Sequence, residues 1–112
     1  MYHFHLTKYW FDKFKDGSKS VEYRFYTERL KKQIFKDMRS ACSSWSSARL
    51  YCGYPKKDDS SRILRAKVVC INFPLWYQLP ADVREFMLKN CKEQIFEDSV
   101  FVAFQLREVS NV

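Results

Sequence analysis

The chain has 112 residues and a net charge of +7, with 46% hydrophobic and 18% aromatic residues. The length suits one domain over residues 1–112, and the hydrophobic share excludes a disordered chain. The charge is uneven: residues 1–79 carry 16 Lys and Arg against 7 Asp and Glu, and residues 80–112 carry 4 against 6. A basic body either favours a polyanionic partner such as nucleic acid or only keeps the chain soluble.

The cysteines, at positions 42, 52, 70 and 91, are widely spaced and form no C-x-x-C pair. This spacing argues against zinc, and we expect neither a metal ion nor a cofactor. The sequence shows no apolar run long enough for a signal peptide or a membrane span. We therefore expect a cytoplasmic protein with reduced thiols and no membrane contact.

The first elements in chain order are a strand and a helix. Apolar and polar residues alternate over 2–7, which predicts a half-buried strand. Thr7 is suited to cap a following helix whose aromatic residues share one side. Gly17 then stands where the C-terminus of a helix favours positive φ. Alternation resumes over 20–28 and predicts a second strand, with Glu22 and Arg24 on the same face.

Residues 29–42 change to a helical period. The apolar positions predict one inner face, which consists of Leu30, Ile34, Phe35, Met38, Ala41 and Cys42. A basic stripe lies opposite and consists of Arg29, Lys32, Lys36 and Arg39. Such a stripe is most often a solvated helix face, although in a basic protein it also suits contact with phosphates.

The rest of the chain predicts strands over 48–54 and 62–73, a helix that begins at Pro80, and a closing strand over 100–106. The inner face of this last helix is expected to be Val83, Phe86, Met87 and Cys91. About five strands and three helices, in an order that does not repeat strand–helix–strand, predict an α+β domain. We expect a mainly antiparallel sheet that forms a small barrel.

The corner between the first helix and the second strand gathers charged residues. Lys19 lies in the turn, and Glu22 and Arg24 follow two residues apart on the strand, so the three converge beside a helix end. The lysine suits a phosphate contact or, with a lowered pKa, a nucleophile or base. Arg24 offers a planar fork to phosphate or a base edge. An exposed surface ion pair of little energetic value is the alternative.

The segment "GSKSVEYR" matches G-x-K-x-x-E-x-R at Gly17, Lys19, Glu22 and Arg24. This is the signature of the ASCH domain, a branch of the PUA-like superfamily, and "HFHLTKYWFDKFKDGSKSVEYR" resembles the family's opening strand, helix and motif. The stretches "LRAKVVCINF" and "SVFVAFQL" resemble its later barrel strands more weakly. The resemblance implies a small PUA-like β-barrel whose motif lines a cleft, and binding of RNA or a modified nucleotide.

The family also contains enzymes, so two classes of function remain open. Some bacterial relatives are amidohydrolases of N4-acetylcytidine, and others are metal-dependent ribonucleases. The amidohydrolases have Thr where this chain has Glu22, and they need a downstream Glu whose counterpart here would be Asp82 or Glu85. In an enzyme, the resemblance would make Lys19 and Glu22 catalytic. A third hypothesis is a protein-interaction module with a basic surface.

Three other features bear on the site. Residues 29–47 replace a short turn that many family members have, which would cover the mouth of the barrel or extend its basic surface. His3 and His5 share a strand face, and without an evident third ligand an exposed polar face is favoured over a metal site. Trp45 either stacks a base or closes the end of the core.

Overall fold

The computed structural model describes residues 1–40, 46–96 and 99–112, except for the side chains of residues 39 and 40. Its strands and α-helices, in chain order, are β1 Tyr2–Leu6, α1 Lys8–Lys15, β2 Val21–Phe25, α2 Glu28–Ser40, β3 Ser46–Cys52, β4 Ile63–Asn72, α3 Ala81–Cys91 and β5 Phe101–Asn111. The element types match the predictions. The second strand is shorter than predicted, because Glu28 already begins α2. No helix within the described ranges has both the length and the apolar character needed to cross a membrane.

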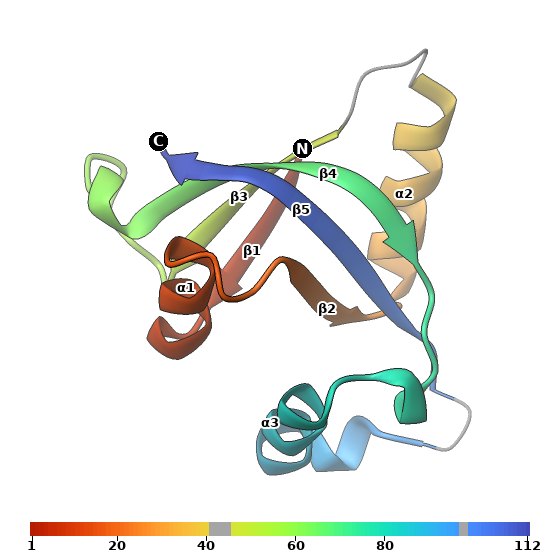
Figure 1. Cartoon of the computed structure of the whole chain (residues 1–112). Helices are drawn as coiled ribbons and strands as arrows, with labels where there is room; N and C mark the ends of the chain where they lie inside the picture. The colour runs from red at the N-terminus through yellow and green to blue at the C-terminus, as the bar shows by residue number, and fades with distance from the viewer. Residues whose placement is uncertain (41–45, 97–98) are drawn as a thin grey trace.

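The five strands form one sheet in the order β1-β3-β4-β5-β2. Only the β1–β3 pair is parallel, and the other three pairs are antiparallel, as predicted. The sheet curls into a half-barrel, so that its two edge strands, β1 and β2, approach each other (Figure 1). α1 and α3 flank this opening, and α2 stands on the side of the sheet away from α1. The fold is therefore α+β, with three helices around a curled sheet.

The core lies on the concave side of the sheet and is rich in rings. The Phe104 ring of β5 lies 5.0 Å from the Phe4 ring and 4.9 Å from the Tyr2 ring, both of β1. Leu50 and Leu64 fill the space beside them and are buried. α1 adds its own buried aromatic side, which the sequence predicts, and this side consists of Trp10, Phe11 and Phe14. Packing of these rings fixes α1 against β1, β3 and β5, and the turn from α1 into β2 is where the site forms.

The predicted inner face of α2 is wrong in part. Ile34 is buried, but Phe35 is 53% and Met38 is 71% exposed. The helix contacts the rest of the fold through a side that includes polar residues: Gln33 Nε2 donates to Met1 O at 2.7 Å, and Ser46 Oγ donates to Asp37 Oδ2 at 3.1 Å. This contact turns Phe35 and Met38 outwards. Ala41 and Cys42 lie outside the described residues.

Candidate functional site

The turn after α1 places Lys19. Gly17 has φ +84°, the left-handed conformation that its position predicts. Its N–H donates to Phe14 O at 3.3 Å, and the Lys19 N–H donates to Lys13 O at 3.1 Å. These bonds satisfy carbonyl groups that the end of the helix leaves free, and they turn the chain towards β2. The Lys19 backbone is thereby fixed against the helix end.

β2 carries Glu22 and Arg24 on the core-facing side of the sheet. In the register with β5, Glu22 pairs with Phe104 and Arg24 pairs with Val102, and both partners are fully buried. Glu22 is only 4% exposed. An exposed strand face with a surface ion pair, which is the alternative that the sequence leaves open, therefore does not describe this corner.

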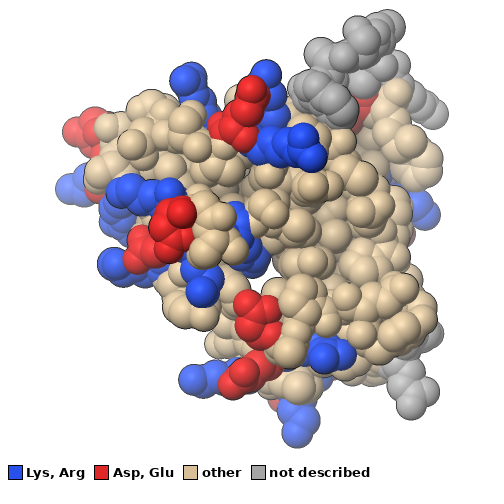
Figure 2. Space-filling view, in the orientation of Figure 1, with Lys and Arg blue, Asp and Glu red and all other residues tan. Residues whose placement is uncertain are grey.

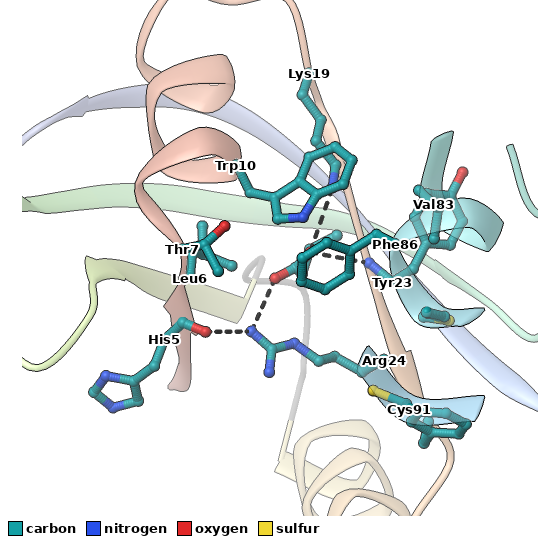
Figure 3. A pocket seen from close by; sticks show the side chains of 13 residues that line it. His5, Leu6, Thr7, Trp10, Lys19, Tyr23, Arg24, Val83, Phe86 and Cys91 are labelled. Carbon is teal, nitrogen blue, oxygen red and sulfur yellow. Dashed lines mark hydrogen bonds and ion pairs between the residues drawn. The ribbon is translucent and has the colours of Figure 1, made fainter. Parts of the chain in front are cut away.

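Lys19, Glu22 and Arg24 form one ion cluster, which we call the charge cluster. Arg24 Nη2 donates to Glu22 Oε2 at 2.9 Å, and Lys19 Nζ lies 3.6 Å from Glu22 Oε1 (Figure 3). The N–H of Tyr23 also donates to Oε1, at 3.2 Å. Burying a carboxylate without partners costs free energy, and the two cations offset this cost for Glu22. The cluster as a whole carries one net positive charge.

Lys19 is enclosed by rings as well as by the carboxylate. Its Nζ lies 3.9 Å from the centre of the Trp10 ring and 5.3 Å from that of Phe14. Both distances are within the range of cation–π attraction. Burial lowers the pKa of the Lys19 ammonium below its usual value, and the Glu22 and Asp82 carboxylates oppose that shift. A buried lysine with a lowered pKa is a common feature of functional sites.

Arg24 also bridges the opening between the two edge strands. The same Nη2 donates to the main-chain oxygen of His5 at 3.1 Å, and the guanidinium carbon lies 5.2 Å from the centre of the Phe4 ring. β1 and β2 are not hydrogen-bonded neighbours in the sheet. The Arg24 side chain thus joins β2, which follows α1, to β1, which precedes α1.

The charge cluster faces a pocket of about 180 Å³ between α1, β2 and α3, which we call the motif pocket. In the space-filling view the surface is hollowed where α1 and α3 approach each other (Figure 2). The walls are mainly apolar, and the charged groups converge at one side. The lining residues are His5, Leu6, Thr7, Trp10, Lys19, Glu22, Tyr23, Arg24, Phe25, Val83, Phe86, Met87 and Cys91.

The pocket offers several kinds of contact to a planar polar ligand. Tyr23 and Phe86 are partly exposed rings in its wall. The Thr7 side chain, which the sequence suggests as a helix cap, makes no cap hydrogen bond and lines the pocket instead. Arg24 has N–H groups besides those of Nη2 that can donate to a ligand. A carboxylate has about four acceptor positions, and the contacts of Glu22 use only some of them. An apolar pocket with a few convergent polar groups is the usual form of a small-ligand site.

The structure does not bring the other predicted site residues into this pocket. Lys32 and Lys36 are exposed on α2, and Glu85 is exposed on α3. Of the two acidic candidates on α3, Asp82 is the one near Lys19, because both line a second hollow beside the motif pocket. Trp45 lies outside the described residues.

Within the described part of the chain, the histidines and the thiols do not form a metal site. His5 Nδ1 donates to Gly53 O at 2.8 Å, and His3 Nδ1 shares a hydrogen bond of 2.8 Å with the Tyr51 hydroxyl. Among the described residues, no group of three or more His, Cys, Asp or Glu side chains could hold a metal ion. Three of the cysteines are described, and all three are free and partly buried.

The pocket residues that sequence reasoning missed come from outside the motif. The sequence predicts Trp10 and Phe86 only as residues on the inner faces of two helices, and Thr7 only as a helix cap. Their helical spacing indicates a buried side but not which part of that side borders a cavity. Comparison of the chain with protein-family models, curated proteins and solved structures returned no match.

Proposed function

We propose that this chain is an ASCH-type, PUA-like domain that binds RNA or a modified nucleotide by holding one base in the motif pocket. The observation that carries the proposal is the meeting of the charge cluster with aromatic walls in one pocket of about 180 Å³. All four residues of the G-x-K-x-x-E-x-R motif contribute: Gly17 shapes the turn, and the other three form the cluster. Unpaired thiols at three described cysteines suit a cytoplasmic location.

Size and chemistry both favour a single base. A cavity of about 150 Å³ accepts one benzene ring, so the motif pocket is large enough for one planar heterocycle and too small for a stack of several. Rings in the wall can contact the face of a base. Arg24 can donate to a base oxygen or nitrogen or to a phosphate, and Glu22 can accept from an exocyclic amine such as that of cytosine. Lys19 adds positive charge at the same point.

A second candidate, hydrolysis of a modified nucleoside or of RNA, is favoured by the state of Lys19. Burial lowers the pKa of its ammonium, which moves the amine towards the neutral form that acts as a nucleophile or base. The Thr7 hydroxyl and the Glu22 carboxylate line the same pocket. This arrangement resembles the lysine, threonine and glutamate set of the N4-acetylcytidine amidohydrolases in residue types, although not in sequence order.

One set of assays separates these candidates. The protein is incubated with RNA oligomers, cytidine and N4-acetylcytidine, with and without Mn²⁺, and retention, cleavage and deacylation are measured. Retention without turnover supports the binding domain. Turnover supports the enzyme. If neither occurs with any of these compounds, the base-binding proposal is overturned and a protein partner becomes the better hypothesis.

Two substitutions of Lys19 sharpen this test. Lys19→Arg keeps a cation beside Glu22, because an arginine stays protonated. The substitution removes the primary amine, since a guanidinium takes its place. A binding domain should therefore retain most of its affinity in this variant, whereas an enzyme that uses the amine should lose turnover. Lys19→Met removes the charge and should weaken ligand retention in both cases.

A further inference from the structure

Four rings form a stack on the outer face of β1 and β3. The His5 ring lies 4.2 Å from the Tyr54 ring and 4.7 Å from the Tyr51 ring, and the planes differ by 15° and 17°. The His3 ring continues the stack, 5.8 Å from Tyr51 at 23°. We call these four residues the ring ladder.

The register of the sheet explains why the ladder forms. His3 and His5 alternate with buried residues of β1, and His5 pairs with Tyr51 of β3. Hydrogen bonds at both histidines hold the rings in place: His3 with the Tyr51 hydroxyl and His5 with Gly53 O. Gly53 has φ +68°, which turns the chain so that Tyr54 comes back over His5. The ladder is thus a fixed surface.

Tyr54 is the terminal ring of the ladder, and it is 84% exposed. One face of its ring lies on His5, which leaves the other face open to solvent. An exposed ring that is held parallel to its neighbours can stack with a base. The base binds without any change in the positions of the rings beneath it, so binding costs little conformational entropy.

The surface beside the ladder carries positive charge. A groove of about 610 Å³, which we call the outer groove, runs between β1, the end of β2 and α2, and His3, His5 and Tyr54 form one of its sides. Arg24 and Arg29 lie on the other side, and none of the described residues that line this groove is acidic. Aromatic rings opposite arginines are the combination that single-stranded nucleic acid uses, with stacking for bases and cations for phosphates.

The outer groove adjoins the motif pocket. His5, Arg24 and Phe25 line both. The Arg24 guanidinium, which is bonded to Glu22 on the pocket side and to His5 O on the other, lies at the boundary. A strand with one base in the pocket would therefore carry its backbone past Arg24 and bring the adjacent nucleotide to His5 and Tyr54. His5 itself points its ring away from the pocket (Figure 3).

We infer that the ring ladder and the outer groove bind the nucleotides that flank the base in the motif pocket, so that the ligand is single-stranded RNA rather than a free nucleoside. This inference rests on the proposed function and adds a second site to it. Stacking on rings is tolerant of sequence, because every base has a flat face. The ladder therefore contributes affinity and strand preference, and the pocket contributes base preference.

The test compares ligands of different length. Binding of a labelled single-stranded hexanucleotide, of the matching mononucleotide and of the same hexamer in a duplex is measured by fluorescence anisotropy or competition. Tyr54→Ala should weaken hexamer binding about fivefold to a hundredfold and leave mononucleotide binding unchanged. Tyr54→Phe, which keeps the ring, should bind the hexamer like the parent. Tyr77→Ala is the matched control, since Tyr77 is 69% exposed and lines neither site.

The outcomes distinguish this inference from the proposed function. If the parent binds the mononucleotide but Tyr54→Ala does not weaken the hexamer, the ladder is not a binding site and the pocket proposal stands. Equal binding of single strand and duplex would also overturn the inference. If the parent binds neither mononucleotide nor hexamer, the proposed function fails and the inference fails with it. Because Tyr54 is on the surface, loss of folding does not confuse the result.

Discussion

Arg24 Nη2 donates a hydrogen bond to the main-chain oxygen of His5 at 3.1 Å, and this bond spans the two edge strands of the sheet. The same nitrogen is bonded to Glu22, so the position of β1 relative to β2 depends on the charge cluster. The opening of the half-barrel and the floor of the motif pocket are therefore held by one guanidinium. This relationship predicts that Arg24 serves the fold as well as the ligand.

Arg24→Met should destabilise the protein by about 1–2 kcal/mol, because it removes hydrogen bonds of a charged donor and leaves Glu22 with one cation fewer. Chemical denaturation measures this change. Arg84→Met is a matched control: Arg84 also donates to a main-chain oxygen, that of Tyr77, but joins no edge strands. Equal losses in the two variants would mean that the bond to His5 has no special structural value.

Glu22→Gln tests the burial of the carboxylate. The substitution keeps the shape but leaves the largely buried Lys19 and the partly exposed Arg24 without a counter-charge. Breaking a buried ion pair costs about 3–5 kcal/mol, and since the amide oxygen still accepts a hydrogen bond we expect about 2–3 kcal/mol here. Asp12→Asn is the control, because Asp12 forms an exposed pair with Lys8 and should change stability little. A Glu22→Gln variant as stable as the parent would show that the cluster is well solvated.

The local elements follow from short-range patterns, and the site does so only in part. Alternation gives β1, and a glycine at a helix end gives the turn at Gly17. The alternation of apolar and polar residues in β2 predicts that Glu22 and Arg24 share a face of the strand. It does not predict that this face is buried beside Phe104, because the curl of the sheet decides which face of β2 the rest of the protein covers. Phe86 reaches the pocket from a helix far along the chain, and no local pattern links it to Lys19. The exposure of Phe35 has the same cause: tertiary contacts choose the buried side of α2.

Gly17→Ala should destabilise the fold by about 1 kcal/mol, because φ +84° is unfavourable for a residue with a Cβ. Apart from Gly17 and its two chain neighbours, no described residue has an atom within 4 Å of the position that a Cβ would take, so the cost comes from the backbone and not from a clash. Gly17→Asn should cost less, since asparagine tolerates this conformation. Unfolding curves of the three proteins check the order. If the alanine and asparagine variants are equally stable, the left-handed turn is not what the glycine provides.

The unfolding free energy should depend on pH through Lys19. Burial lowers its pKa in the folded state below the unfolded value of 10.5. At a pH below the folded pKa the amine is protonated in both states, so the cost of burying the ammonium is fully present. As the pH rises through the folded pKa towards 10.5, the folded protein loses this proton first and that cost is relieved. The parent should therefore gain stability relative to Lys19→Met over this range. A relative loss would mean that attraction to Glu22 outweighs burial.

Salt dependence of RNA binding tests the basic stripe on α2. Arg29 lines the outer groove, and Lys32 and Lys36 continue from it along the same side of the helix. An RNA strand that leaves the outer groove over Arg29 would run along Lys32 and Lys36. Each phosphate of a single strand that the protein neutralises adds about 0.7 to the slope of log affinity against log salt concentration. Replacing Lys32 and Lys36 together by Gln should reduce the slope by up to about 1.4 and weaken all sequences alike.

The control for this experiment is Lys89→Gln, because Lys89 is exposed in the last turn of α3 and lines neither the pocket nor the groove. Its slope should equal that of the parent. Arg29→Gln should reduce the slope by about 0.7. This variant distinguishes phosphate contacts in the outer groove from contacts along Lys32 and Lys36. If Arg29→Gln changes the slope and the double lysine variant does not, the strand ends in the groove and the stripe is only a solvated helix face. If neither changes it, the phosphates pass elsewhere, and the path from the motif pocket over Arg24 towards α2 is wrong.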